Sequence, residues 1–461
     1  MKQKTLALVL AAMMTTSLLA GCGSSGDNSS KDSNSEDSSN EDNSNEEDNS
    51  TDGDSKKDNI VITVATRYSN DNPDENYYRE KVEEFSAMDN GITIEMDNIS
   101  TEADYLDKLR TSFANGDTPN VFLEYGGSRC LDYLEADALL DLKQYLDEND
   151  GEWYNHFYDS MWGQSVYEGY DGIYSVPFKC YLVPLFYNKE LFADAGIEPP
   201  TTLDEMMKAC ETFKEKGVLP FQAGEKDNYR FGHFNNCLII KSLGVEAVDK
   251  LAKRELAYDS DEMKSTYQYM VDMMENGYFG ENVLDTDAPT EVSAFKAGNV
   301  AMKWDGSWFI ANEIYGTDFY DKVGVVPFPY GDESCKTYSQ GGASDLFFIS
   351  QLNKSEEEIQ ASVEFLKFIT SPDYYAGLDE VAQTVVPVKF EKTENSPENP
   401  LLDEVIKIQE ELTDMRTDVQ NYDPQSHMLD TVRSALQGIA MGDSADQCAK
   451  NIMDRMAEYG E

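Results

Sequence analysis

Short apolar runs alternate with amphipathic segments along most of the chain. Three short runs, each beginning with a β-branched residue, predict strands at 60–65, 92–96 and 121–123. Between them, two segments repeat apolar residues every three or four positions, which predicts helices at 77–88 and 102–115, the second ended by Gly116. Strand, helix, strand, helix, strand is typical of an α/β fold with a mostly parallel sheet.

The same alternation continues toward the C-terminus. Helical periodicity predicts further helices at 263–276, at 356–370 and from about Leu429, and apolar runs predict strands at 182–187, 323–326 and 346–350. Ligands of parallel sheets bind beyond the carboxyl ends of the strands. That rule marks Arg67 and Tyr68 after the first strand and Glu124 after the third.

The first 21 residues are typical of a secretory signal. Lys2 and Lys4 precede an apolar run at 6–20 that is too short to span a bilayer comfortably. The run ends in the sequence LAGC at 19–22, which resembles a bacterial lipobox. The resemblance implies cleavage after Gly21 and a diacylglycerol on the sulfur of Cys22, an anchor that holds stably because it has two acyl chains. An ordinary secretory cleavage site is the alternative.

Residues 22–59 are predicted to be a lipidated cysteine followed by a disordered acidic tether. From residue 23 onward this segment contains only Gly, Ser, Thr, Asn, Asp, Glu and three lysines. Without apolar side chains it cannot bury enough surface to offset the entropy of the chain.

Acidic residues dominate the composition of the 461-residue chain. It has 37 Lys and Arg against 88 Asp and Glu, a net charge of −51. This balance argues against nucleic acid as a partner, because phosphate binding needs clustered basic residues. The signal holds two lysines, and the tether holds three lysines against twelve acids, which leaves −44 on residues 60–461. Such a body repels anionic ligands and tolerates neutral or cationic ones.

The chain lacks the local motifs of common catalytic and metal sites. The three histidines, 156, 233 and 427, are far apart, and no nucleophile elbow, P-loop or C-x-x-C occurs. We therefore predict no catalytic residue, no metal and no cofactor. The cysteines after Cys22 are expected to be free thiols. Because carboxylates are abundant, a glycosidase pair stays open as an alternative.

Several motifs occur in a fixed order through the middle of the chain: GDTPNV at 116–121, DGIYSVPF at 171–178, LFYNKELF at 185–192, AGIEPPTTLDE at 195–205, FKAGNVAM at 295–302 and GSW at 306–308. Together they resemble the family 1 bacterial extracellular solute-binding proteins. These are the sugar-binding subunits of ABC importers, related to maltose-binding protein.

This resemblance implies a two-lobed fold of the periplasmic-binding-protein type (type II), with a mostly parallel sheet flanked by helices in each lobe. The ligand cleft lies at the hinge, which closes around the solute. By analogy, the N-terminal lobe comprises residues 58–179 and 338–388, and the C-terminal lobe comprises 180–337 and 389–461.

Sugars present C–H faces and rims of hydroxyl groups, so their sites need flat aromatic rings and converging polar groups. Trp308 corresponds to the family position that stacks on sugar, and Trp304 could supply a neighbouring ring. Tyr181 and Lys179 follow the crossover at 177–178, and Lys179 stands where the family prefers a smaller residue. The expected ligand-binding residues are Trp308, Tyr181, Trp304, Glu124, Tyr68, Arg67, Lys179, Asp305 and Gly342.

The resemblance implies a monomeric carbohydrate-binding protein, attached through Cys22 to the outer face of the cytoplasmic membrane of a Gram-positive bacterium. Its partners would be an oligosaccharide and the membrane-spanning subunits of an ABC permease. Two alternatives stay open: an exported glycan-degrading enzyme, and the same fold with a peptide, polyamine or metal chelate as ligand.

Overall fold

The computed structural model describes residues 59–425 and 427–460. The predicted signal, Cys22 and nearly all of the predicted tether lie outside the described residues. Residues from Lys57 onward form one compact unit. Within the described part of the chain, no helix is long and apolar enough to cross a membrane.

The larger sheet mixes parallel and antiparallel pairs. Its strands are β1 (Ile60–Thr66), β2 (Ile92–Asn98), β3 (Val121–Glu124), β4 (Val176–Leu182), β8 (Tyr338–Ile349) and β9 (Asp414–Arg416). β1 pairs in parallel with β2 and β3, as the alternating pattern predicts. β8 runs antiparallel between β3 and β4, and β9 pairs with its first residues. Only the last part of β8 was predicted, because residues 339–345 are mostly polar or glycine.

The smaller sheet is antiparallel throughout, which corrects the expectation of a mostly parallel sheet in each lobe. It has β5 (Leu185–Asn188) in the middle, with β6 (Met302–Trp304) and β7 (Val323–Val326) on either side. The strand predicted at 182–187 is divided between β4 and β5. Pro184 lies at the break, because proline has no N–H to donate to a sheet ladder.

The helices of the first part of the chain are α1 (Pro73–Ala87), α2 (Glu102–Asn115), α3 (Leu131–Glu135), α4 (Lys143–Leu146), α5 (Glu148–His156), α6 (Lys189–Ala195), α7 (Leu203–Glu215) and α8 (Arg230–Leu243). Those that follow are α9 (Glu246–Ala252), α10 (Asp261–Glu275), α11 (Ala288–Lys296), α12 (Glu356–Ile369), α13 (Pro372–Val381), α14 (Pro400–Glu411), α15 (Met428–Ala440) and α16 (Ala445–Glu458).

The five predicted helices are confirmed within a few residues at each end. α1 begins earlier than predicted, because the Asn72 side chain accepts from the backbone N–H of Glu75 and Pro73 fits the first helical position. Thr202 begins α7 and forms a reciprocal capping box with Glu205. Gly116 ends α2 in the left-handed conformation that favours glycine.

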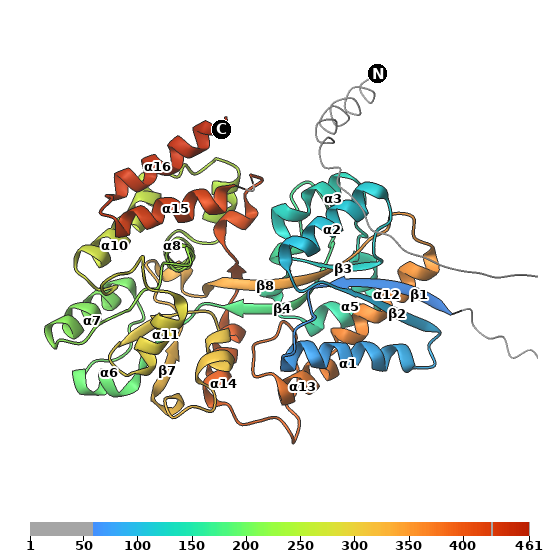
Figure 1. Cartoon of the computed structure of the whole chain (residues 1–461), viewed down its shortest axis with the longest axis horizontal. Helices are drawn as coiled ribbons and strands as arrows, with labels where there is room; N and C mark the ends of the chain where they lie inside the picture. Colours follow the sequence, from blue (N-terminus) through green and yellow to red (C-terminus); the bar gives the residue numbers. More distant parts are fainter. Residues whose placement is uncertain (1–58, 426, 461) are drawn as a thin grey trace, which may run out of the picture. The chain divides into compact units, whose positions relative to one another are not determined.

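Three hydrophobic cores hold these elements together. The N-terminal core comprises buried residues between Ile62 and Phe178 and between Ala343 and Val388. The C-terminal core comprises residues between Val183 and Phe328 and between Val419 and Met456, and a third core draws on β4, β7, α11 and α14. β4 and β8 lie side by side between α1 and α12 at one end and α8 and α10 at the other (Figure 1).

β4 passes from one core to another along its length. Phe178 packs in the N-terminal core, and Cys180 and Leu182 pack in the third core. Such a strand is a suitable connection between two lobes, although the predicted lobe boundaries stay a prediction. The cysteines of the described chain, at 130, 180, 210, 237, 335 and 448, are free and buried, as predicted.

Candidate functional site

A cavity of about 640 Å³ lies beside β4 and β8. Three of the predicted ligand-binding residues line it: Lys179, Tyr181 and Trp308. The first two belong to β4, where alternate side chains lie on one face of the sheet. Trp308 comes from the turn after β6, more than a hundred residues away in the sequence. The fold therefore brings two separately predicted groups to one cavity.

Aromatic rings form one wall of this cavity. The Tyr181 and Trp308 rings lie 5.3 Å apart, centre to centre, at 49°. After Trp308 the chain enters a helical segment at Ile310–Ile314, and Ala311, Asn312 and Tyr315 also line the cavity. The segment is a π-helix, and it places these three residues and Trp308 on the same cavity. Gly306 leaves the room that the Trp308 ring occupies, because a Cβ there would overlap the ring.

His233 adds a polar group beside this aromatic wall. Its Nε2 lies 3.7 Å from Oδ1 of Asp418, and its ring centre lies 6.1 Å from that of Trp308. Burial lowers the pKa of His233 below its ordinary value, although Asp418 acts in the opposite direction. A neutral ring with its proton on Nε2, toward Asp418, leaves Nδ1 as an acceptor. Nδ1 is buried and has no hydrogen-bond partner in the structure, which leaves one ring nitrogen of this cavity residue unsatisfied.

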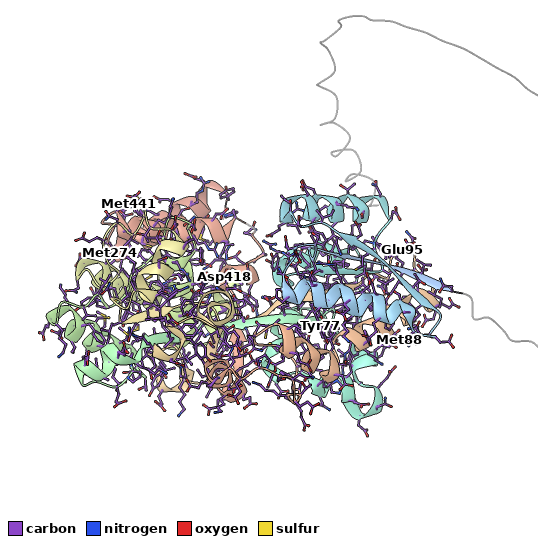
Figure 2. The ribbon with its side chains drawn as sticks, turned by 60° about the horizontal axis from the view of Figure 1, so that its bottom comes forward. Tyr77, Met88, Glu95, Met274, Asp418 and Met441 are labelled. Atoms are coloured by element: carbon purple, nitrogen blue, oxygen red, sulfur yellow. The ribbon has the colours of Figure 1, made fainter. Side chains whose placement is uncertain are left out.

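Asp418 is held in place by a polar network of the C-terminal region. Its Oδ1 accepts from Asn236 Nδ2 at 2.8 Å, and its Oδ2 accepts from Arg433 Nη2 at 3.0 Å. Figure 2 labels Asp418 near the middle of the view. These partners come from α8 and α15, so elements that are distant in sequence hold the Asp418 carboxylate near His233.

Lys179 lines the cavity and forms an ion pair with Asp74 at the beginning of α1. Its Nζ lies 2.6 Å from Oδ2 of Asp74 and 4.3 Å from the centre of the Tyr68 ring. Asn72 and Asp74 also line the cavity. The cavity therefore contains a complete ion pair rather than an isolated charge, which suits a neutral ligand.

Arg67 and Tyr68 converge on Asp345 at the carboxyl end of β1. Arg67 Nη2 lies 2.5 Å from Oδ1 of Asp345, and the Tyr68 hydroxyl donates to its Oδ2 at 2.7 Å. Burial, with Asp345 acting in the same direction, raises the pKa of Tyr68. Arg67 also bonds to the Tyr125 hydroxyl and lies over its ring. Arg67 and Tyr68 do not line the cavity, and their role in ligand binding stays a prediction.

Glu124 lies beside this network and is buried. One of its carboxylate oxygens accepts from the backbone N–H of Tyr125 at 2.8 Å and lies 3.6 Å from Arg129. Burial raises the pKa of Glu124, opposed by that backbone hydrogen bond and by Arg129. Glu124 does not line the cavity, and its role as a ligand acceptor stays a prediction.

The structure corrects the predictions for Trp304 and Asp305. Trp304 is 1% exposed and packs against Phe221, Phe234 and Phe279, so neither face of its ring is free for a ligand. Asp305 is buried, and its carboxylate pairs with Arg230 and Lys303. Trp304 is the last residue of β6, a strand whose three residues are all buried, whereas Trp308 follows that strand.

Gly342 lies in β8 opposite Tyr181 and does not line the cavity. The neighbouring Gly341 has φ +142°, and a Cβ there would overlap the carbonyl of Tyr181. Glycine thus permits the close pairing of β4 and β8 that carries Lys179 and Tyr181. The role of Gly342 in ligand binding stays a prediction.

Sequence reasoning missed several cavity residues. Asn312 and Tyr315 could have been proposed from the sequence, because they follow Trp308 within seven residues. His233 had none, because a lone histidine on a buried helix is usually a core residue. The remaining wall, residues 378–386, had no signal that linked it to a site 70 residues earlier.

A second cavity of about 660 Å³ lies elsewhere and contains none of the predicted site residues. Glu168 and Lys253, which line it, form an ion pair at 3.2 Å. Across residues 59–425 and 427–460, no group of three His, Cys, Asp or Glu is arranged to hold a metal ion. The aromatic wall and the unpaired His233 acceptor therefore single out the first cavity.

Comparisons with known proteins agree on the fold. A chitin oligosaccharide binding protein of known structure has a TM-score of 0.70 to this chain at 23% identity, over 87% of this chain and 99% of that one. The bacterial solute receptor AcbH has a TM-score of 0.75 at 15% identity, over 88% and 99%. The mixed α/β, two-lobed periplasmic-binding-protein fold is thereby confirmed.

Sequence comparison identifies the family. The multiple sugar-binding protein of Streptococcus mutans is 23% identical over 299 residues, 64% of this chain and 68% of that protein. Residues 70–376 match the bacterial extracellular solute-binding proteins, a family of extracytoplasmic binding proteins rather than of enzymes. Because this match covers most of its length, the chain belongs to the bacterial extracellular solute-binding protein family.

Proposed function

We propose that this protein is the extracellular substrate-binding subunit of an ABC importer and captures a neutral oligosaccharide. One observation carries the choice of ligand: the Tyr181 and Trp308 rings form an aromatic wall beside an unpaired, buried acceptor on His233. The names of its relatives, which include a multiple sugar-binding protein and a chitin oligosaccharide binding protein, support the same class of ligand.

The physical basis is the complementarity between a sugar and this wall. The C–H face of a pyranose ring can cover the face of Trp308, which removes apolar surface of both from water. The hydroxyl rim then needs acceptors and donors, and His233, Asn312 and Asn72 offer them around the same cavity. The charge of −44 on residues 60–461 disfavours an anionic ligand.

Capture would proceed by hinge closure. The cavity is lined by Phe178 of the N-terminal core and by Tyr181, which packs against the C-terminal core. A ligand that contacts both sides binds the closed form more tightly than the open form and shifts the population toward it. The permease would recognise that closed form, and its partner subunits would hydrolyse ATP.

Three predicted residues outside the cavity are also included in this proposal. Arg67, Tyr68 and Glu124 lie at the carboxyl ends of β1 and β3, where a longer oligosaccharide could extend beyond the cavity. We also propose that Cys22 carries the lipid that attaches a monomeric protein to the outer face of a Gram-positive membrane. Radioactive palmitate labelling of the full chain, lost in Cys22→Ala, tests this point.

Thermal unfolding with a broad panel of neutral mono- and oligosaccharides tests the proposed function. A sugar at 100 times its Kd should stabilise the protein by about 2.7 kcal/mol. Trp308→Ala should abolish the shift, and His233→Gln should weaken binding about tenfold. His156→Gln, a histidine outside the cavity, is the control.

An absence of any shift across the panel would contradict a sugar ligand. Saturable binding of a peptide or polyamine instead would keep the binding role and replace the ligand class. Release of shorter sugars from a bound glycan would support the alternative of a glycan-degrading enzyme.

A further inference from the structure

One wall of the cavity is aliphatic rather than aromatic. Its aliphatic side chains come from the end of α13 and the stretch after it, which also contributes the polar Gln383 and Thr384: Leu378, Val381, Ala382, Val385 and Val386. Val381 is 47% exposed, one of few large apolar side chains in the described chain with that much free surface. Leu378, Val385 and Val386 are buried, so Val381 provides most of the uncovered aliphatic surface at the cavity that the proposed function assigns to a sugar.

This wall is a built part of the fold. The backbone N–H of Ala382 donates to the Leu378 carbonyl at 2.8 Å, and Gln383 Nε2 donates to the Asp379 carbonyl at 2.6 Å. Further along, Gln409 Nε2 donates to the Val386 carbonyl at 2.9 Å. These bonds hold the stretch from α13 onward against the rest of the protein.

The neighbouring residues of the stretch are anchored in different cores. Val385 is buried in the third core, and Val386 is buried in the N-terminal core. A segment anchored on both sides in this way cannot turn its aliphatic groups away from the cavity without losing two sets of core contacts.

An unsubstituted sugar does not complement this surface. Its ring face is already matched by Trp308 and Tyr181, and a hydroxyl placed against valine side chains loses hydrogen bonds to water without replacement. A methyl group placed there removes apolar surface of both partners from water. Thr384, which also lines the wall, has a hydroxyl that can donate to a carbonyl oxygen beside such a methyl group.

We infer that the oligosaccharide carries acetyl or similarly small acyl groups, and that the 378–386 wall receives them. This inference rests on the proposed function, because it assigns a substituent to the sugar bound at the same cavity. The acyl methyl contacts Val381 and its aliphatic neighbours, and the sugar ring faces Trp308. The wall therefore selects acylated over unsubstituted glycans of the same backbone.

Calorimetric titration of matched neutral pairs tests the inference. Triacetylchitotriose and cellotriose share a β-1,4-glucosyl backbone and differ in the acetamido group. O-acetylated xylotriose and mannotriose are compared with the same preparations after mild alkaline removal of the esters. We expect at least a fourfold tighter Kd for the acetylated member of one or more pairs, the effect of about one buried methyl group.

Two variants connect that preference to the wall. Val381→Asn should reduce the acetyl preference to less than twofold. Val166→Asn is a matched control, because Val166 is 48% exposed but lies outside this cavity, and it should keep the full preference. Both positions are exposed, so both variants should fold.

Equal or weaker binding of the acetylated member in every pair, or binding by no member of any pair, overturns the inference. A preference that survives in Val381→Asn overturns it as well. If unsubstituted sugars of the broad panel bind while acetylation adds nothing, the proposed function stands alone. If no glycan in either panel binds, both fail.

Discussion

Nζ of Lys179 lies 2.6 Å from Oδ2 of Asp74, which joins the strand β4 to the beginning of α1 at the edge of the cavity. Both side chains are about one third exposed, at 31% and 30%. Water screens such a pair, so its contribution to the free energy of unfolding is small. Because both residues line the cavity, the pair can affect the affinity for a ligand directly.

Lys179→Met should separate these two roles. We expect the free energy of unfolding to change by less than about 1 kcal/mol. Affinity for the neutral sugar should fall about tenfold, because Asp74 is left as an unpaired carboxylate in the cavity wall. Calorimetry measures the affinity and urea titration the stability. Lys81→Met, which breaks an ion pair with Glu84 on α1 outside the cavity, should leave affinity unchanged.

The two tryptophans near the site should behave in opposite ways. Trp304→Ala should lower the free energy of unfolding by about 3–5 kcal/mol, because it opens a void between Phe221, Phe234 and Phe279. Trp308→Ala should cost less stability, since its ring is partly exposed, and should abolish sugar binding. Denaturant titration of both variants measures the loss of stability, and calorimetry measures the loss of sugar binding. A large loss of stability in Trp308→Ala with intact binding would contradict this assignment.

The buried charges around Asp305 should matter for stability and not for the ligand. Burial alone raises the pKa of Asp305, but Lys303 and Arg230 lower it more strongly, so the net pKa lies well below its ordinary value. Asp305→Asn leaves these cations with one carboxylate partner fewer and should cost about 3–5 kcal/mol of stability in urea. The exposed Asp132→Asn is the control. Changed ligand specificity in the folded Asp305→Asn protein would contradict a purely structural role.

The pH dependence for Asp305 follows from the direction of its shift. A carboxyl with a lowered folded-state pKa stabilises the protein above its unfolded value, about 3.9, and that contribution is lost as pH falls through the folded value. The stability gap between the native protein and Asp305→Asn should therefore narrow only in strong acid.

Glu225 should give the opposite pH dependence. Burial raises the pKa of Glu225 to about 7, against a backbone hydrogen bond from Phe231 and the attraction of Arg433. The contribution of Glu225 to the free energy of unfolding is fully present below about pH 4.3 and is lost as the pH rises through 7. Glu225→Gln imitates the protonated form. It should match the native protein near pH 4.5 and exceed its stability by up to about 3 kcal/mol at pH 8.

Thermal and urea unfolding between pH 4 and 8 measure this difference. Glu255→Gln, at an exposed position, should follow the native protein at every pH. A constant difference between Glu225→Gln and the native protein would show that Glu225 does not titrate in this range.

Much of the local structure could be predicted from short-range patterns. β1, β2, β3 and β7 and the periodic helices α2, α10, α12 and α15 were expected within a few residues, since propensity and capping act over a single element. The motifs around Trp308 and β5 also indicated the family before any contact was known. β8 was harder, because its ladder pairs polar and glycine residues that show no alternation.

Residues of the candidate site could likewise be predicted only where a local motif contains them. Trp308, Tyr181 and Lys179 could be named because they stand in motifs whose order along the chain is informative. Trp304 and Asp305 are in the same segment, and only three-dimensional packing shows that they lie in the core.

By itself, the sequence determined the α/β class, the acidic body and the order of the elements, and its resemblance to a known family pointed to Trp308 as the residue that stacks on a sugar. Each of these depends on residue type and on spacing within one segment. The tertiary structure alone decided that His233, Asp74 and Val381 share a cavity with Trp308 and that the second sheet is antiparallel. Those facts depend on which distant segments pack together, and packing is a property of the whole folded chain.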